Sequence, residues 1–407
     1  MEAKQDLAIE RERAFALVCA LLNPFRVGET AQPLSASPED AARMYEFACA
    51  HGVRPALLKA LLRRSDLPPA MEQLRSRLAE FQVLHRFAVM QATGQIIDLA
   101  RAFERAGLDA MFFKGATLGE QIYGGAQFRE FNDIDVLVRP ADRERTIGEI
   151  EALKFQPIIA DPRMRRGFFD YLRQHSFRST ETGAVVDFHW AFVGTGPFPV
   201  STEQALSSRT QILLGGTSIS VPSAETQALI LAGHGHKENW ASFGWILDFA
   251  TFAAVNPDLP WDGIASRARA QHCLEPLLGA VLLVERVFDH TIDPQLAALG
   301  AKRLALVQNI SIVIARSKSL TDRQRTEELM GGFRLCETPA QRFKMAASLL
   351  ITPSIGDFET MPLPYSWWWM YRLTRPLRLL LRKLRGLTPE QSGSATSSIA
   401  RSTGNAA

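Results

Sequence analysis

The chain has 407 residues, of which 46% are hydrophobic and 22% charged, close to the average for globular proteins. This composition excludes a mainly disordered, collagen-like or low-complexity chain, and the length predicts two or three domains. Lysine and arginine number 46, and aspartate and glutamate number 43. A balance this even lacks the charge signature of a nucleic-acid-binding protein, so no nucleic-acid partner is expected.

The four cysteines are scattered and form no CxxC pair, which argues against a zinc ribbon or a thioredoxin-like redox site. Such sparse cysteine usage is typical of a reducing compartment. The N-terminus lacks the apolar segment of a secretory signal, and no run of about 18 apolar residues predicts a membrane-spanning helix. We therefore expect a cytoplasmic protein.

Residues 1–107 are predicted to be helical, because helix-forming residues dominate and β-branched residues are few. Residues 41–62 have apolar side chains at helical spacing, with a break between Gly52 and Pro55. Residues 71–107 form a long run of helix formers. The apolar positions that recur in this run at three- and four-residue intervals are Phe81, Leu84, Phe87, Ala88 and Met90.

Residues 108–222 alternate between short apolar runs and helical patterns, which is typical of an α/β core. The predicted strands are residues 110–113, 133–139, 155–159 and 184–190. The predicted helices of this region are residues 116–123 and 141–153.

The rest of the chain divides into three parts by composition. Residues 223–350 are predicted to be a helical C-terminal domain, which opens with an N-cap at Ser223. Residues 351–390 are rich in proline and tryptophan and then basic, and residues 391–407 are predicted to be a disordered tail.

The most informative local pattern is Asp133-Ile134-Asp135 at the start of a predicted strand. Side chains alternate across a strand, so the two carboxylates share a face about 7 Å apart along the chain. Neighbouring carboxylates repel unless a cation lies between them. Mg²⁺ is suited to this role, because it binds carboxylate oxygens together with substrate phosphates.

Two further segments strengthen this interpretation. Asp187 lies in an apolar strand, where a charge usually has a partner or a metal, and His189 follows on the same face. Lys114 and Gly115 form the turn between a strand and a helix, where backbone amides and the helix N-terminus favour a phosphate.

In this order, the motifs resemble those of the nucleotidyltransferase superfamily with the DNA polymerase β-like fold. More narrowly, FFKGATLGEQIYGGAQFREFNDIDVLV and VVDFHW are similar to a bacterial group of nucleotidyltransferases. Its members are commonly found beside genes for polysaccharide or peptide natural-product biosynthesis. The fold implied is a mostly helical α+β protein, in which a small mixed sheet with helices is flanked by N- and C-terminal helical regions.

The resemblance assigns a role to each matching residue. Asp133, Asp135 and Asp187 match the metal-binding carboxylates of a two-ion Mg²⁺ site and are the predicted catalytic residues. The predicted nucleotide- and phosphate-binding residues are Lys114, Gly115, Arg129 and His189. His175, His236 and Asp248 lie where the group often has polar residues.

The turn departs from the wider superfamily, which has Gly-Ser or Gly-Gly where this chain has Lys114-Gly115. Two hypotheses follow. In the first, the protein transfers a nucleoside monophosphate from an NTP, ATP above all, to an unidentified acceptor. In the second, the site is catalytically degenerate and the protein is a nucleotide-binding or scaffold protein. A Lys114 side chain that points at the carboxylates and competes with metal would favour the second.

The same residues allow other interpretations. In a haloacid-dehalogenase-type phosphatase the apolar run precedes the DxD, whereas here it follows. A GT-A glycosyltransferase requires several strands before the motif. Arg129 could simply pair with an acid, and His189 could be a core histidine. The histidines at 234, 236 and 272 lack the acids or cysteines of a metal site at tight spacing, which favours packing or substrate contact.

The C-terminal segment contains Trp367, Trp368 and Trp369, and the stretch from Arg372 to Arg385 is basic and contains no acid. A basic amphipathic helix with interfacial aromatics can lie on an anionic membrane. A helix that packs on the protein and exposes a basic face is the alternative. Peripheral membrane contact is therefore one predicted interaction.

Overall fold

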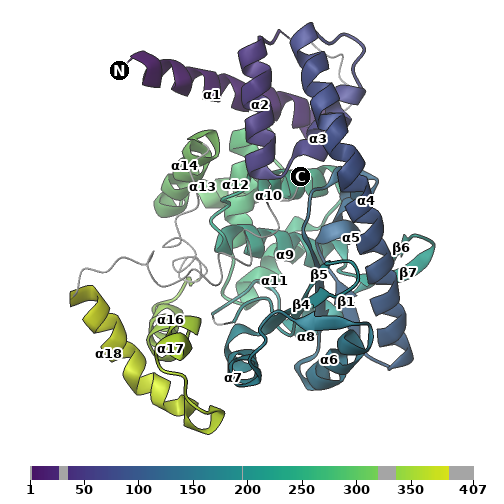
Figure 1. The fold of residues 1–407 in the computed structure, drawn as a ribbon. Coiled ribbons are helices and arrows are strands. Elements are labelled where there is room, and N and C mark those ends of the chain that lie inside the picture. The colour runs from purple at the N-terminus through teal and green to yellow at the C-terminus, as the bar shows by residue number, and fades with distance from the viewer. Residues whose placement is uncertain (1, 27–34, 195, 320–335, 385–407) are drawn as a thin grey trace.

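A computed structural model describes residues 2–26, 35–194, 196–319 and 336–384. The predicted fold class is confirmed: the protein is mostly helical, with a small mixed sheet between two helical regions (Figure 1). The predicted disordered tail, residues 391–407, lies outside the described residues.

The N-terminal region consists of helices, as expected. They are α1 (Glu2–Leu22), the 3-10 helix η1 (Pro24–Arg26), α2 (Pro38–His51), α3 (Arg54–Leu62) and α4 (Pro69–Arg105). A capping box between Ser37 and Asp40 starts α2. Gly52 ends α2 in the left-handed conformation with a φ of 65°, so the predicted break is confirmed.

The long helix α4 packs a different stripe from the one that its large apolar residues suggest. Its buried positions include Leu78, Ile96 and Leu99. By contrast, Leu84 and Phe87 are 63% and 59% exposed. The helix therefore leaves an apolar patch in solvent.

The central sheet has five strands in the order β1-β2-β5-β4-β3. They are β1 (Ala110–Phe112), β2 (Asp133–Val138), β3 (Phe155–Pro157), β4 (Gln174–Ser179) and β5 (Val185–His189). Only β2 and β5 are parallel, and every other neighbouring pair is antiparallel. The sheet is therefore mixed, and its parallel pair carries all three predicted acids.

Helices and a hairpin complete the core region. They are α5 (Gly115–Tyr123), η2 (Ala126–Phe128), η3 (Pro140–Asp142), α6 (Arg143–Ala152), α7 (Pro162–Leu172), α8 (Thr202–Ser207) and the antiparallel pair β6 (Thr210–Leu214) and β7 (Thr217–Val221). The sequence did not predict β4, α7, α8 or the β6–β7 hairpin.

The C-terminal region is again helical. Its helices are α9 (Ala224–Lys237), α10 (Phe243–Val255), α11 (Trp261–Ala270), α12 (Glu275–Phe288), α13 (Pro294–Ala301), α14 (Leu304–Ser319), α16 (Pro339–Ile351), α17 (Ile355–Thr360), η4 (Tyr365–Met370) and α18 (Tyr371–Leu384). Among the described residues, no single helix is long and apolar enough to cross a membrane, although one bent pair, Pro294–Ala301 with Leu306–Ile314, passes by length and composition.

Two hydrophobic cores lie on opposite faces of the sheet. Ile134, Val136 and Val138 of β2 pack with α4 on one face. On the other face, Leu137 belongs to a core that joins the N-terminal helices to helices α9–α14. The predicted alternation along β2 is therefore confirmed, and Asp133 and Asp135 lie on the face where the two helical regions meet. The domain boundaries stay a prediction.

Candidate active site

The parallel pairing of β2 and β5 brings the predicted acids together. Asp135 pairs with Asp187 in the register of the two strands, and Asp133 lies two residues earlier on the same face of β2. Tertiary structure thus places side chains 52 positions apart in the sequence next to each other.

Three side chains form a group with the spacing of metal ligands. Ligand atoms of Asp135, Asp187 and His189 all lie within 4.8 Å of one another. His189 Nε2 lies 3.0 Å from Asp135 Oδ1, and both residues are 7% exposed. The ring of Phe113 packs edge-on against His189 at 5.3 Å between centroids. His189 is therefore in hydrogen-bond contact with Asp135, while its predicted nucleotide- and phosphate-binding role stays a prediction.

The electrostatics of the group show an excess of negative charge. Burial, together with the carboxylates of Asp135 and Asp187, raises the pKa of Asp133 to about 7. Burial opposes ionisation of Asp135 as well, but Lys114 and His189 outweigh it, and the pKa of Asp135 is lowered. A hard divalent cation suits this site, because oxygen ligands predominate and their charge is only partly balanced.

The turn before α5 closes one side of the acid group. Lys114 has a φ of 66° and a ψ of −150°, an unfavourable backbone conformation for a residue with a side chain. A Cβ on Gly115 would lie 3.1 Å from the carbonyl oxygen of Asp133, so glycine permits the close approach of the helix. Lys114 Nζ lies 3.8 Å from Asp135 Oδ1. The lysine therefore points at the carboxylates.

Arg129 pairs with an acid that lies far away in the sequence, and not with an acid beside it. Its guanidinium donates to Asp248 Oδ2 at 2.9 and 3.1 Å from two nitrogens. Tyr123 donates its hydroxyl to Asp248 Oδ1 at 3.0 Å, and burial raises the pKa of this tyrosine. Arg129 Nη1 also lies 3.5 Å from the carbonyl oxygen of Gly115. This contact joins α5, the segment before β2 and α10, while the predicted phosphate role of Arg129 stays a prediction.

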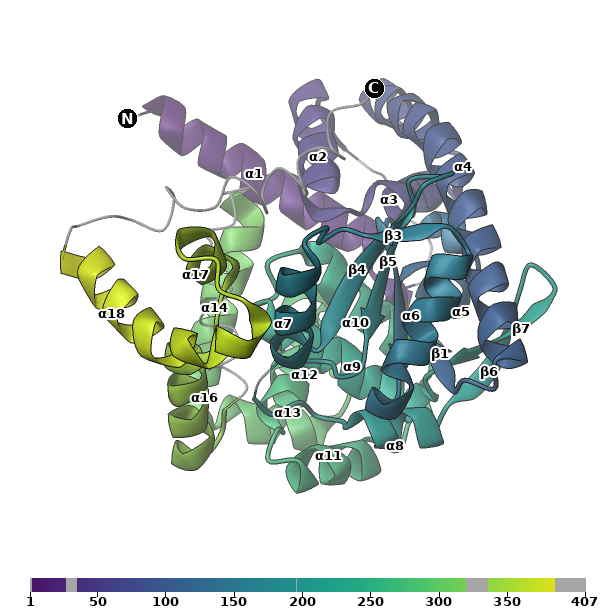
Figure 2. The ribbon, with the colours of Figure 1, turned by 60° about the horizontal axis from the view of Figure 1, so that its bottom comes forward.

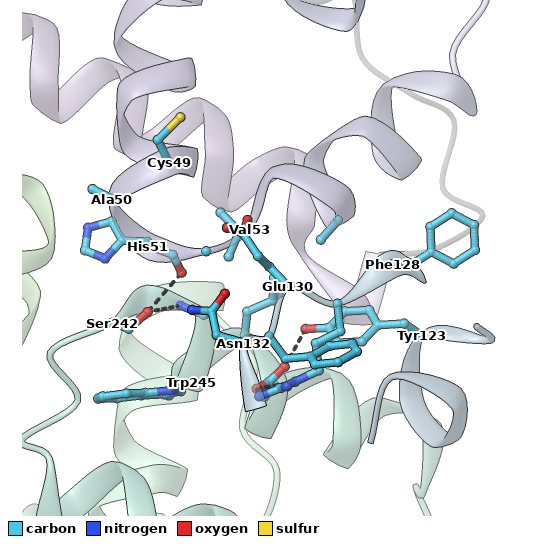
Figure 3. Close-up of a pocket in the computed structure, with 17 residues that line it drawn as sticks. Cys49, Ala50, His51, Val53, Tyr123, Phe128, Glu130, Asn132, Ser242 and Trp245 are labelled. Atoms are coloured by element: carbon cyan, nitrogen blue, oxygen red, sulfur yellow. Dashed lines mark hydrogen bonds and ion pairs between the residues drawn. The ribbon is translucent and has the colours of Figure 1, made fainter. Parts of the chain in front are cut away.

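Arg129 and Asp248 also line a cavity of about 250 Å³. Its walls come from the turn between α2 and α3, the segment that leads into β2, and the start of α10. Figure 3 shows Asn132, Ser242 and Trp245 on one side of the cavity and Tyr123 and Phe128 on the other. Because Asn132 directly precedes Asp133, the cavity lies beside the acid-bearing strand.

Three other histidines that the sequence singled out lie away from the acid group or pack against aromatic rings. His175 is buried against Phe177, and burial lowers its pKa to about 4. The His234 ring contacts Trp245, and His236 is buried in α9. Among the described residues, the one group of three metal-ligating side chains is Asp135, Asp187 and His189, and these histidines are not part of it.

The mixed sheet, the acids on its parallel strand pair and the glycine turn that faces them are the features that the resemblance to nucleotidyltransferases implies. A family model described as an uncharacterised nucleotidyltransferase matches residues 37–289. The chain therefore belongs to this nucleotidyltransferase family.

Other comparisons are more distant. One similar structure is an antigenic nucleotidyltransferase-like protein from Paracoccidioides brasiliensis, with 15% sequence identity and a TM-score of 0.30. The match covers 54% of this chain and 92% of that one. A search of curated proteins finds no match.

Proposed function

We propose that this protein is a Mg²⁺-dependent enzyme that transfers a nucleoside monophosphate from an NTP to an acceptor and releases pyrophosphate. The observation that carries the proposal is the group of Asp135, Asp187 and His189 within 4.8 Å, with Asp133 beside it. ATP is the first NTP to test. The bacterial group that the motifs resemble favours a biosynthetic or modification pathway.

Each side chain has a distinct part in this proposal. Asp133, Asp135 and Asp187 would hold Mg²⁺, and His189 would keep Asp135 in its orientation. When bound, two such ions stabilise the charge on the attacking and leaving oxygens. Lys114 and the amides at the start of α5 would contact the triphosphate.

The proposed transfer forms one phosphorus–oxygen bond and breaks another. An acceptor oxygen forms a bond to the α-phosphorus, and the bond from that phosphorus to the α,β-bridging oxygen breaks. Pyrophosphate leaves, and the acceptor proton passes to Asp187 or to water. The cavity beside Asn132 is our candidate for the acceptor site, because its walls offer both hydrogen-bonding groups and the Trp245 ring.

A second candidate is a degenerate nucleotide-binding or scaffold protein. The observation that favours it is the 3.8 Å distance between Lys114 Nζ and Asp135 Oδ1. An ammonium so near a carboxylate supplies positive charge to the position where a metal would bind. On this alternative, the protein binds nucleotide weakly or not at all.

Calorimetry with each of the four NTPs, with and without Mg²⁺, tests the proposal. We expect wild type to bind an NTP only with Mg²⁺ and Asp133→Ala/Asp135→Ala to lose that binding. A matched control is Asp258→Ala/Asp262→Ala, which removes two exposed carboxylates from the start of α11 and the loop before it. Absence of binding by folded wild type would contradict the transferase and favour the scaffold.

A further inference from the structure

Helix α18 turns two of its arginines, Arg375 and Arg378, toward the protein. Arg375 donates to Asp357, and Arg378 Nε donates to the same carboxylate at 2.6 Å. The Asp357 side chain is only 3% exposed, and these contacts lower its pKa against the effect of burial. This arrangement is the reverse of the packed alternative, in which the basic face points to solvent.

The rotation of α18 about its axis is fixed by two buried aromatics. Tyr371 is fully buried and accepts a hydrogen bond from the amide of Leu363 at 3.0 Å. Trp368 packs on Tyr371 and occupies the space beside Gly167 of α7, where a Cβ would clash with its ring. Residues on the opposite side of the helix are therefore held away from the protein.

The side of α18 that faces outward is apolar. Leu373, Leu377 and Leu380 are spaced three and four residues apart, so they share one helix face, and more than half of each is exposed. Trp369 precedes Leu373 by four residues and is 59% exposed, and Trp367 is 55% exposed. We call these five residues the outer face. Figures 1 and 2 show α18 at the edge of the molecule.

An exposed apolar patch of this size usually marks an interaction surface. Between Cys336 and Leu384 the chain carries seven basic and three acidic residues. Arg372 is exposed and lies next to Leu373. Exposed tryptophans, a row of leucines, an exposed arginine and a net positive charge of this segment match the interface of an anionic bilayer, where indole rings lie at the headgroups and basic side chains contact the lipid phosphates.

We infer that the outer face of α18 binds the surface of an anionic phospholipid bilayer. A second copy of the chain is the competing occupant, and charge disfavours it because two basic segments would face each other. This inference is independent of the proposed function, since bilayer binding requires neither NTP nor Mg²⁺.

Vesicle flotation tests the inference. Wild type should float with vesicles that mix phosphatidylcholine and phosphatidylglycerol, and less with pure phosphatidylcholine or in high salt. Leu373→Gln/Leu377→Gln should lower the partition coefficient about a hundredfold, because each leucine loses about a tenfold contribution from apolar burial. Circular dichroism and the melting temperature should not change, because both sites are exposed.

A matched control is Leu84→Gln/Phe87→Gln on α4, which removes equally exposed apolar side chains far from α18 in the sequence. Its partitioning should equal that of wild type. An equal loss in this control, an unchanged α18 variant, or no flotation of wild type would each overturn the inference. A dimer in analytical ultracentrifugation that the α18 variant converts to monomer would assign the face to a second copy, and would also overturn it.

Discussion

The charges of two buried carboxylates, Asp135 and Asp248, are balanced differently by their neighbours. Asp248 accepts from Arg129 and from Tyr123, so one acid meets one guanidinium and one hydroxyl. Asp135 contacts His189 and Lys114, but two more acids lie nearby and raise the negative charge of the group. The charge of Asp248 is therefore neutralised by Arg129, whereas the acid group around Asp135 keeps a negative charge that a cation could neutralise.

This difference separates structure from function within one region. A balanced buried ion pair holds elements together, and removal of one partner leaves an uncompensated charge. An acid group with excess charge destabilises the unliganded protein and is retained where a ligand compensates it. We therefore expect substitutions at Asp248 to change stability and substitutions at Asp135 to change ligand binding.

The largest expected effect is on stability at Asp248. Asp248→Asn should lower the free energy of unfolding by about 3–5 kcal/mol, because the buried guanidinium of Arg129 loses its counter-charge. Urea unfolding followed by circular dichroism measures it.

The companion variant Arg129→Met/Asp248→Asn should recover most of that loss, since it removes the charge and leaves an acceptor for Tyr123. If the double variant folds but no longer binds NTP, Arg129 also has the phosphate role that the resemblance implies. A single variant as stable as wild type would contradict the structural role of the pair.

The next effect is on ligand binding at Asp135. Asp135→Asn should weaken binding of the Mg²⁺–NTP complex by at least about a hundredfold, because a metal-binding carboxylate is lost. Its stability should change by less than about 1 kcal/mol, since the variant loses the attraction of Lys114 and His189 but relieves the repulsion on Asp133. Calorimetry and urea unfolding on the same preparation measure both. A loss of several kcal/mol with unchanged binding would reverse the comparison.

Much of the acid site could be predicted from the sequence because its signals are local. The DxD strand, the glycine turn and the later Asp187 strand each have their own pattern, and strand alternation placed Asp133 and Asp135 on one face. The roles of the pairs could not be predicted. Arg129 finds Asp248 at a distance of 119 residues, and no local pattern encodes such a partner.

The missed elements had weak patterns for physical reasons. β4 has the sequence QHSFRS, and its buried face consists of His175, Phe177 and Ser179. Because only one of these three residues is hydrophobic, the strand has little hydrophobic alternation. The sequence correctly predicts that α4 and α18 are helices. Which face of each helix packs against the protein depends on residues elsewhere in the chain. Asp357 and Trp368 fix α18, and their effect could not be seen in the spacing of its leucines.

The pH dependence of stability should report the excess charge directly. The pKa of Asp133 is about 7 in the folded protein, against about 4 for an ordinary aspartate. Between these values the folded state holds a proton that the unfolded chain has lost, so the free energy of unfolding should fall as pH rises from about 4 to about 7.

Subtraction of the Asp133→Asn profile isolates the contribution of Asp133 together with its coupling to Asp135 and Asp187, because distant groups such as His175 titrate equally in both proteins. We expect a difference on the order of 2 kcal/mol across the window, reduced by solvent screening of a half-buried carboxylate. Urea unfolding in EDTA at several pH values provides the measurement. Identical pH profiles would show that Asp133 does not experience the neighbouring acids.

The smallest expected effect, at Lys114, also separates the two proposed functions. As a phosphate ligand, Lys114 contributes one charge-assisted contact, so Lys114→Met should weaken NTP binding at saturating Mg²⁺ about tenfold. As an internal counter-ion for Asp135, it would compete with metal, and the same variant would bind Mn²⁺ more tightly in the absence of nucleotide. Calorimetry with Mn²⁺ alone and then with NTP distinguishes these cases. Weaker NTP binding with unchanged Mn²⁺ affinity would support the transferase, because the lysine would then act on substrate rather than in place of the metal.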